Sequence, residues 1–110
     1  MVDIKRVTPE FSVSGQIAPG DIESIATQGF RSIICNRPDG EQAGQPDYSQ
    51  VAEAAVAAGL ESIFVPVSTR GITAADVEAF RAALAKLPAP TLAYCRSGAR
   101  SLNIYTAAKG

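Results

Sequence analysis

Three short apolar runs, each followed by a segment with helical spacing, constrain the fold of this chain more than any other feature. The runs are rich in β-branched and other apolar residues, and they occupy residues 32–36, 62–67 and 91–94. Apolar runs that alternate with helices in this way are typical of a parallel sheet with helical crossovers. The sequence therefore predicts an α/β domain whose sheet is mainly parallel and flanked by helices.

Helix signals separate these runs. We expect helices from Asp21 to Gly29, from Asp47 to Gly59, from Thr73 to about Pro88, and over residues 101–108. The third has the clearest start, because an acidic residue follows Thr73 at the third helical position, as in a capping box. Residues 4–15 are predicted to form a short N-terminal β segment of two strands around a turn. A chain of 110 residues has the size of one domain, so we expect a single domain over residues 1–110.

Charge and residue usage exclude several kinds of site. The formal net charge is −1, so we expect no broad basic surface and no nucleic-acid partner, and any anion site must be local. The chain has no histidine and only two cysteines, Cys35 and Cys95, which lie far apart in the sequence. A Cys/His zinc site and a Cys-His catalytic pair are therefore not expected, and neither a metal nor an organic cofactor is implied.

The sequence also carries expectations about location. No signal peptide is visible, and no apolar run approaches the roughly 20 residues that cross a bilayer. We therefore expect a cytoplasmic protein without a membrane partner, in a reducing setting that keeps a thiol free.

The loop between the last strand and the last helix carries the chemistry. It begins at Cys95, and a loop that closes onto a helix N-terminus directs N–H groups and partial positive charge inward. These features lower the pKa of a thiol, so we expect Cys95 to be a thiolate nucleophile. Arg100 supplies a planar fork for an oxyanion, and the Ser101 hydroxyl could donate to the sulfur. The predicted substrate-binding residues of the loop are Arg96, Ser97, Gly98 and Ala99.

Polar residues that follow another strand belong to the same rim, because ligands bind at the carboxyl ends of parallel strands. Arg37 is predicted to bind the substrate anion, and Asp39 to orient or protonate it. The alternative is that the two form a pair that shapes a turn. Cys35 is expected to be a small buried hydrophobe, although a redox relay with Cys95 is the other interpretation.

The Cys95 loop resembles the active loop of rhodanese-type sulfurtransferases, which have four residues between the cysteine and the arginine. Tyrosine and dual-specificity phosphatases share the design but usually have five. Over nearly its whole length the chain resembles the phosphatase-like domain family of the bacterial beta-lactamase hydrolase-like protein. The matching stretches are residues 11–16, 36–41, 44–46 and the Cys95 loop. The resemblance implies a protein-tyrosine-phosphatase-like fold and either sulfur transfer or phosphate-ester hydrolysis.

Sulfur transfer is the preferred hypothesis. Cys95 would take sulfane sulfur from a small donor as a persulfide and pass it to a thiol acceptor or cyanide, which requires no strong general acid. Because some members of the family are fused to a persulfide dioxygenase, the resemblance also implies sulfide detoxification and a dioxygenase partner.

Phosphate-ester hydrolysis through a Cys95 phosphocysteine is the alternative. It needs an acid for the leaving oxygen. Residues 66–72, where phosphatases usually carry that acid, contain no carboxylate, so Asp39 or Glu41 would have to replace it. A non-catalytic anion-binding module is the third hypothesis, and the oligomeric state is open.

Overall fold

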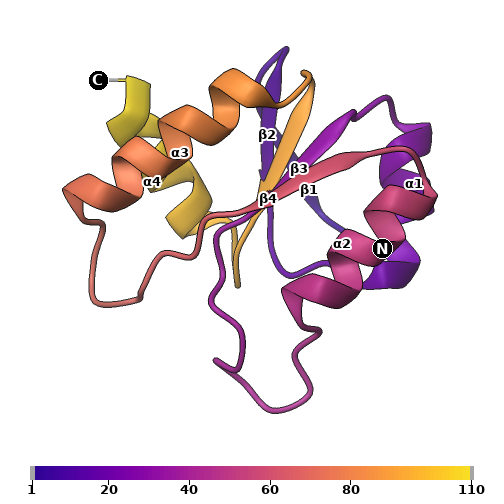
Figure 1. Ribbon diagram of the computed structural model, residues 1–110, viewed down its shortest axis with the longest axis horizontal. Coiled ribbons are helices and arrows are strands. Elements are labelled where there is room, and N and C mark those ends of the chain that lie inside the picture. Colours follow the sequence, from indigo (N-terminus) through magenta and orange to yellow (C-terminus); the bar gives the residue numbers. More distant parts are fainter. Residues whose placement is uncertain (1, 110) are drawn as a thin grey trace.

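The computed structural model describes residues 2–109 and contains one five-stranded sheet in the order β1-β2-β5-β3-β4 (Figure 1). The strands are β1 (Ile4–Thr8), β2 (Phe11–Ser14), β3 (Ser32–Cys35), β4 (Glu61–Phe64) and β5 (Thr91–Tyr94). β1 pairs with β2 antiparallel, and every other neighbouring pair is parallel. The predicted α/β class, the parallel sheet and the short N-terminal β segment are confirmed.

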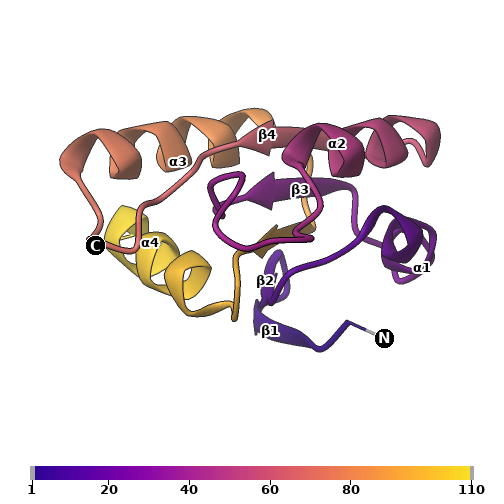
Figure 2. The same ribbon diagram turned by 90° about the horizontal axis from the view of Figure 1, so that it is seen from below.

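Helices cover both faces of the sheet (Figure 2). The single-turn 3-10 helix η1 (Pro19–Asp21), α1 (Ile22–Thr27) and α2 (Tyr48–Ala57) lie on one face, and α3 (Ala74–Lys86) and α4 (Ala99–Lys109) lie on the other. β5 is buried along its whole length and contributes to both cores: Leu92 and Tyr94 to the cluster under α1 and α2, and Ala93 to the cluster under α3 and α4. The central strand therefore ends deep inside the molecule, where Cys95 follows.

Most predicted boundaries agree with the structure for the reasons given by the sequence. Thr73 caps α3, since its Oγ1 accepts from the N–H of Asp76 at 3.1 Å. β4 (Glu61–Phe64) is shorter than the predicted run of residues 62–67. Pro66 does not end the contact with the β3 side, because the N–H groups of Val65 and Val67 still donate to the carbonyls of Cys35 and Asn36, both at 2.9 Å. The last helix also differs from the prediction. It begins at Ala99 and not at Ser101, because the N–H of Leu102 already bonds to the carbonyl of Gly98 at 3.0 Å.

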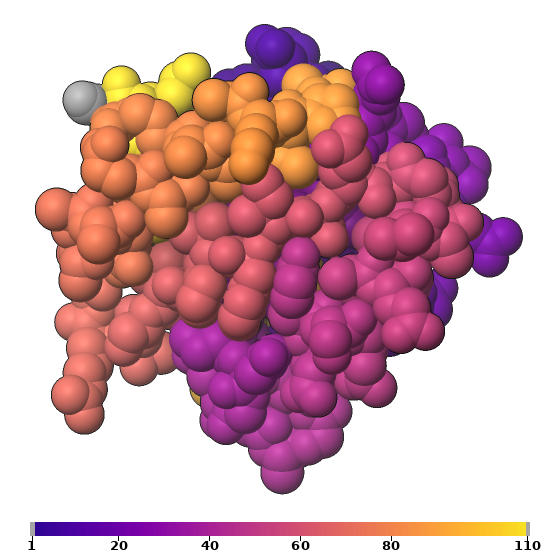
Figure 3. Space-filling view, viewed as in Figure 1, coloured from indigo at the N-terminus to yellow at the C-terminus, as the bar shows by residue number. Residues whose placement is uncertain are grey.

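The segments that follow the parallel strands are hydrogen-bonded to one another at one edge of the sheet, where the carboxyl ends of these strands meet. The N–H of Val67 donates to the carbonyl of Asn36 at 2.9 Å, and the N–H of Gln16 donates to the carbonyl of Arg96 at 3.3 Å. Residues 37–47 project beyond this edge, in purple to magenta at the bottom of Figure 3. These bonds fix the position of the loop that begins at Cys95.

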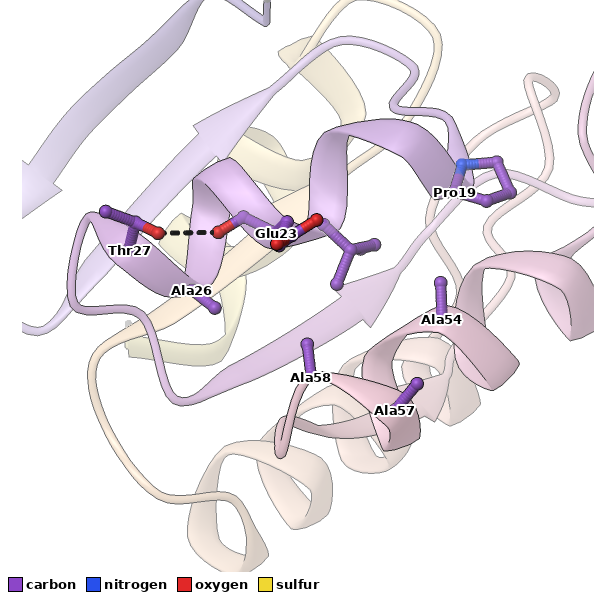
Figure 4. Close-up of a pocket in the computed structure, with 8 residues that line it drawn as sticks. Pro19, Glu23, Ala26, Thr27, Ala54, Ala57 and Ala58 are labelled. Carbon is purple, nitrogen blue, oxygen red and sulfur yellow. Dashed lines mark hydrogen bonds between the residues drawn. The ribbon is translucent and has the colours of Figure 1, made fainter.

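A hollow of about 590 Å³ lies between α1 and α2 (Figure 4). Its lining is mostly small and apolar, with Ala54, Ala57 and Ala58 on one side, and it contains no residue of the Cys95 loop. Within residues 2–109, no helix is long and apolar enough to cross a membrane, and no cluster of three or more potential ligand side chains could hold a metal ion.

Candidate active site

Cys95 lies where β5 passes into α4, with only 1% of the residue exposed. The N–H of Gly98 donates to its Sγ at 3.0 Å. Burial raises the pKa of the Cys95 thiol, but the N–H groups of Ser101, Ser97 and Gly98 and the Ser101 hydroxyl outweigh it, so the pKa is lower than that of an ordinary thiol. Donors arranged in this way stabilise a thiolate and any anion that binds in the same loop.

Two glycines allow this loop to approach the end of β2. Gly98 has φ +97°, a conformation that L side chains rarely adopt. At Gly15, a Cβ would lie 2.9 Å from the carbonyl oxygen of Arg96, which is closer than real Cβ contacts come. The N–H of Cys95 also donates to the carbonyl of Ser14 at 3.3 Å. The backbone of β2 therefore supports the Cys95 loop from one side.

Arg100 lies in the first turn of α4, and its guanidinium is anchored by three acceptor atoms from two residues. Nη1 donates to Glu41 Oε2 at 2.7 Å and to the carbonyl of Val67 at 2.8 Å, while Nη2 donates to Glu41 Oε1 at 2.8 Å. Within residues 2–109 no acceptor is recorded for Nε. These bonds leave Nε and the second hydrogen of Nη2 as the open edge of the guanidinium.

Arg37 is held by three side chains and is 3% exposed. Nε donates to Glu41 Oε1 at 3.0 Å, Nη1 to Gln16 Oε1 at 3.0 Å and Nη2 to Gln42 Oε1 at 3.3 Å. The acidic partner of Arg37 is therefore Glu41, not Asp39 as the turn-shaping alternative supposed. Its predicted contact with a substrate anion stays a prediction.

Glu41 joins the two arginines. Its hydrogen bond with Arg100 lowers the pKa of this carboxyl most, burial acts in the opposite direction, and Arg37 lowers the pKa further. Glu41 is therefore ionised at neutral pH and holds no proton to donate. Its part in orienting Arg100 was not predicted from the sequence, which offered it only as a substitute acid.

The remaining predicted residues fall into two groups. Arg96, Ser97 and Ala99 are exposed on the Cys95 loop, and Ser97 Oγ accepts from the N–H of Ala99 at 3.3 Å. The side chain of Asp39 contacts the start of α2, where its Oδ1 accepts from the N–H of Tyr48 at 2.8 Å. The structure records Glu41, and not Asp39, in contact with Arg100. A catalytic role for Asp39 stays a prediction.

Ser101 is fully buried, and its Oγ donates to Asn36 Oδ1 at 2.8 Å. Asn36 is also fully buried and directly follows β3. The sequence placed Asn36 at the end of a strand and in a stretch that resembles the family, but no role in the site was predicted for it. A signal was present, since it is the one amide in the run of residues 32–36, at a carboxyl end of the sheet.

Cys35 differs from Cys95 in its surroundings. Burial raises the pKa of the Cys35 thiol to about 11, and its Sγ lies 3.3 Å from the carbonyl of Arg37. Both cysteines are free thiols in the structure. A neutral, buried thiol agrees with the interpretation of Cys35 as a small hydrophobe.

A parallel sheet with a cysteine loop between its central strand and a helix, and an arginine in the first turn of that helix, defines a phosphatase-like domain of the protein-tyrosine-phosphatase type. The family model of the beta-lactamase hydrolase-like protein, phosphatase-like domain, matches residues 3–110. The chain belongs to this family, as its sequence resemblance indicated.

Curated relatives carry the same family name. The chain is 43% identical over 100 residues to a beta-lactamase hydrolase-like protein of Agrobacterium fabrum, covering 91% of the chain and 23% of that protein. It is 40% identical over 102 residues to the protein of that name from Xylella fastidiosa, covering 93% of the chain and 24% of the relative. The chain therefore spans about a quarter of the length of these relatives.

Solved structures agree on the fold. A presumed phosphatase from Neisseria meningitidis has a TM-score of 0.85 and 38% identity, covering 93% of the chain and 72% of that protein. Another from Shewanella putrefaciens has a TM-score of 0.84 at 20% identity, over 96% of the chain and 66% of its own length. The domain is therefore phosphatase-like, which agrees better with the alternative hypothesis from the sequence than with the preferred sulfur transfer.

Proposed function

We propose that Cys95 is the nucleophile of a group-transfer enzyme and that the group it carries is sulfane sulfur. The observation that supports sulfur most is the placement of the acids. Glu41, which contacts Arg100, is held ionised by two guanidinium groups. Asp39 accepts a backbone N–H at the start of α2, and Asp76 caps α3. An alkoxide leaving group requires a proton, whereas sulfite or a thiolate does not.

The proposed reaction has two steps. The Cys95 thiolate attacks the outer sulfur of a donor such as thiosulfate; a new S–S bond forms, and the old one breaks as sulfite leaves with the electron pair. A thiol or cyanide then attacks the outer sulfur of the persulfide, and Cys95 leaves as thiolate. The N–H groups of Ser97, Gly98 and Ser101 that lower its pKa would stabilise it in both roles. Sulfide detoxification beside a persulfide dioxygenase would fit this chemistry.

Phosphate-ester hydrolysis is the second candidate, and the family and its structural neighbours favour it. Cys95 would attack phosphorus, and the open edge of Arg100 would bind equatorial oxygens of the phosphoryl group. With Glu41 ionised, such an enzyme would favour esters whose leaving group departs without a proton, such as aryl phosphates. Alkyl phosphates would react far more slowly.

Both candidates can be tested on the same preparations. Thiocyanate formation from thiosulfate and cyanide is measured beside hydrolysis of an aryl phosphate, for the wild-type protein and Cys95→Ser. The proposal expects Cys95-dependent thiocyanate at a kcat/KM well above that for the phosphate. Cys95-dependent phosphate release without thiocyanate would reject sulfur transfer in favour of the second candidate. Neither product, with anion binding retained in Cys95→Ser, would indicate a binding module.

A further inference from the structure

We propose that Asn36 is a positioning residue, which holds the Ser101 hydroxyl beside the Cys95 sulfur. The inference rests on the proposed role of Cys95 as the nucleophile. It extends that role to the residue that directly follows β3, whose side chain bonds to Ser101 and to the carbonyl of Val65.

Asn36 is held rigidly from four directions. Its N–H donates to the carbonyl of Tyr94 at 2.8 Å, and its own carbonyl accepts from the N–H of Val67 at 2.9 Å. Its side-chain Nδ2 donates to the carbonyl of Val65 at 2.9 Å. The remaining side-chain atom, Oδ1, accepts from Ser101 Oγ. Because a carbonyl can only accept, Val65 fixes which end of the amide faces Ser101.

This orientation matters because Ser101 acts on Cys95. Its hydroxyl and its N–H both lower the pKa of the thiol. A serine near a helix N-terminus has other acceptors for its hydroxyl, among them the backbone carbonyl four residues earlier, here that of Ser97. The amide oxygen of Asn36 selects the rotamer that keeps Oγ next to the sulfur. The hydroxyl donates to Oδ1 in the structure, and it would turn toward the sulfur when Cys95 is a thiolate.

The charged and titratable groups near the Cys95 sulfur do not replace Ser101 as a hydrogen-bond donor to it. Arg100 from α4 and Cys35 from β3 interact electrostatically with Cys95. The positive charge of Arg100 is compensated by Glu41, and burial keeps Cys35 neutral. The Ser101 hydroxyl, held in place by Asn36, is therefore a neutral hydrogen-bond donor that can turn toward the sulfur.

The test is a double-mutant cycle on the pH dependence of Cys95 alkylation by iodoacetamide, read by intact mass in the full chain. Asn36→Ala should move the alkylation midpoint upward by about one pH unit, which means about tenfold less thiolate below the midpoint. Ser101→Ala should do the same. If Asn36 acts through Ser101, adding Asn36→Ala to Ser101→Ala should change nothing further.

Ser32→Ala is the matched control. It removes a buried hydroxyl at the other end of β3, which bonds to the carbonyl of Pro88 and to Thr91, both at 2.7 Å. It should lower stability without moving the midpoint. If Asn36→Ala does not fold, Asn36→Ser, too short to reach Ser101, should give the same shift.

The outcomes separate the inference from the function on which it rests. Additive shifts, or an unmoved midpoint in a folded Asn36 variant with a low wild-type midpoint, would overturn the inference alone. An ordinary thiol midpoint in the wild-type protein would overturn the proposed nucleophile as well.

Discussion

Glu41 and Arg100 form a bidentate ion pair, with Nη1 2.7 Å from Oε2 and Nη2 2.8 Å from Oε1. The same carboxylate accepts from buried Arg37, at 3.0 Å. Glu41 thus compensates the positive charge of two arginines, one in the loop after β3 and the other in the helix after β5. It connects the loop after β3 to the first turn of α4 and orients Arg100.

Glu41→Gln should therefore lower both stability and turnover. A buried Arg37 that loses its acidic partner should reduce the free energy of unfolding by about 2–3 kcal/mol, as in broken buried pairs. Urea unfolding at neutral pH measures this change. Glu53→Gln, at an exposed position on α2, is the control and should have almost no effect. Equal stability of the two variants would show that the carboxylate charge is unimportant.

The same pair gives a pH dependence. The pKa of Glu41 is lowered from its ordinary value of 4.5, so its ion pairs contribute stability above that value. The contribution is lost as the pH falls through the lowered pKa. The difference in unfolding free energy between the wild-type protein and Glu41→Gln should be constant near neutral pH and shrink in acid. A difference that grows in acid would contradict the assignment.

The two thiols should differ in reactivity. Cys95 has a lowered pKa, whereas burial raises the pKa of Cys35 to about 11. Iodoacetamide at neutral pH should modify Cys95 and leave Cys35 intact, as peptide mapping of the labelled protein would show. Labelling of Cys35 before Cys95 would reverse their assigned environments.

Gly98→Ala tests the curvature of the loop. Gly98 and Gly59 both have positive φ, but a Cβ at Gly98 would lie 3.4 Å from the backbone of Ser14, whereas at Gly59 it would meet open space. Both alanine variants should lose about 1–2 kcal/mol of stability. Only Gly98→Ala should also slow Cys95 alkylation. Comparable slowing in Gly59→Ala would mean that general destabilisation is the cause.

The fold was predictable because its signals are local. Apolar runs, capping residues such as Thr73 and turn glycines each act within a few positions of the chain, and they place Cys95 at a strand end. The start of the last helix was predicted two residues late, because Gly98 supplies the first helical carbonyl although it is a glycine with positive φ.

The partners in the site were harder to predict. Glu41 and Arg100 are 59 residues apart, and Asn36 and Ser101 are 65 apart. No local pattern states which acid of residues 37–46 turns toward Arg100, and the prediction from the sequence favoured Asp39, with Glu41 only as a substitute acid. Their separation depends on Tyr48, whose N–H binds Asp39 at the start of α2. Which acid contacts Arg100 therefore depends on the three-dimensional structure of the whole loop and not on a local sequence pattern.

The most direct test of the central claim is the intact mass of the protein after one exposure to thiosulfate or glutathione persulfide, with Cys95→Ser in parallel. We predict that the wild-type protein gains one sulfur atom, mapped to Cys95 and removed by cyanide or a thiol, and that Cys95→Ser gains none. An unchanged wild-type mass, or the same gain in Cys95→Ser, would contradict a persulfide on Cys95.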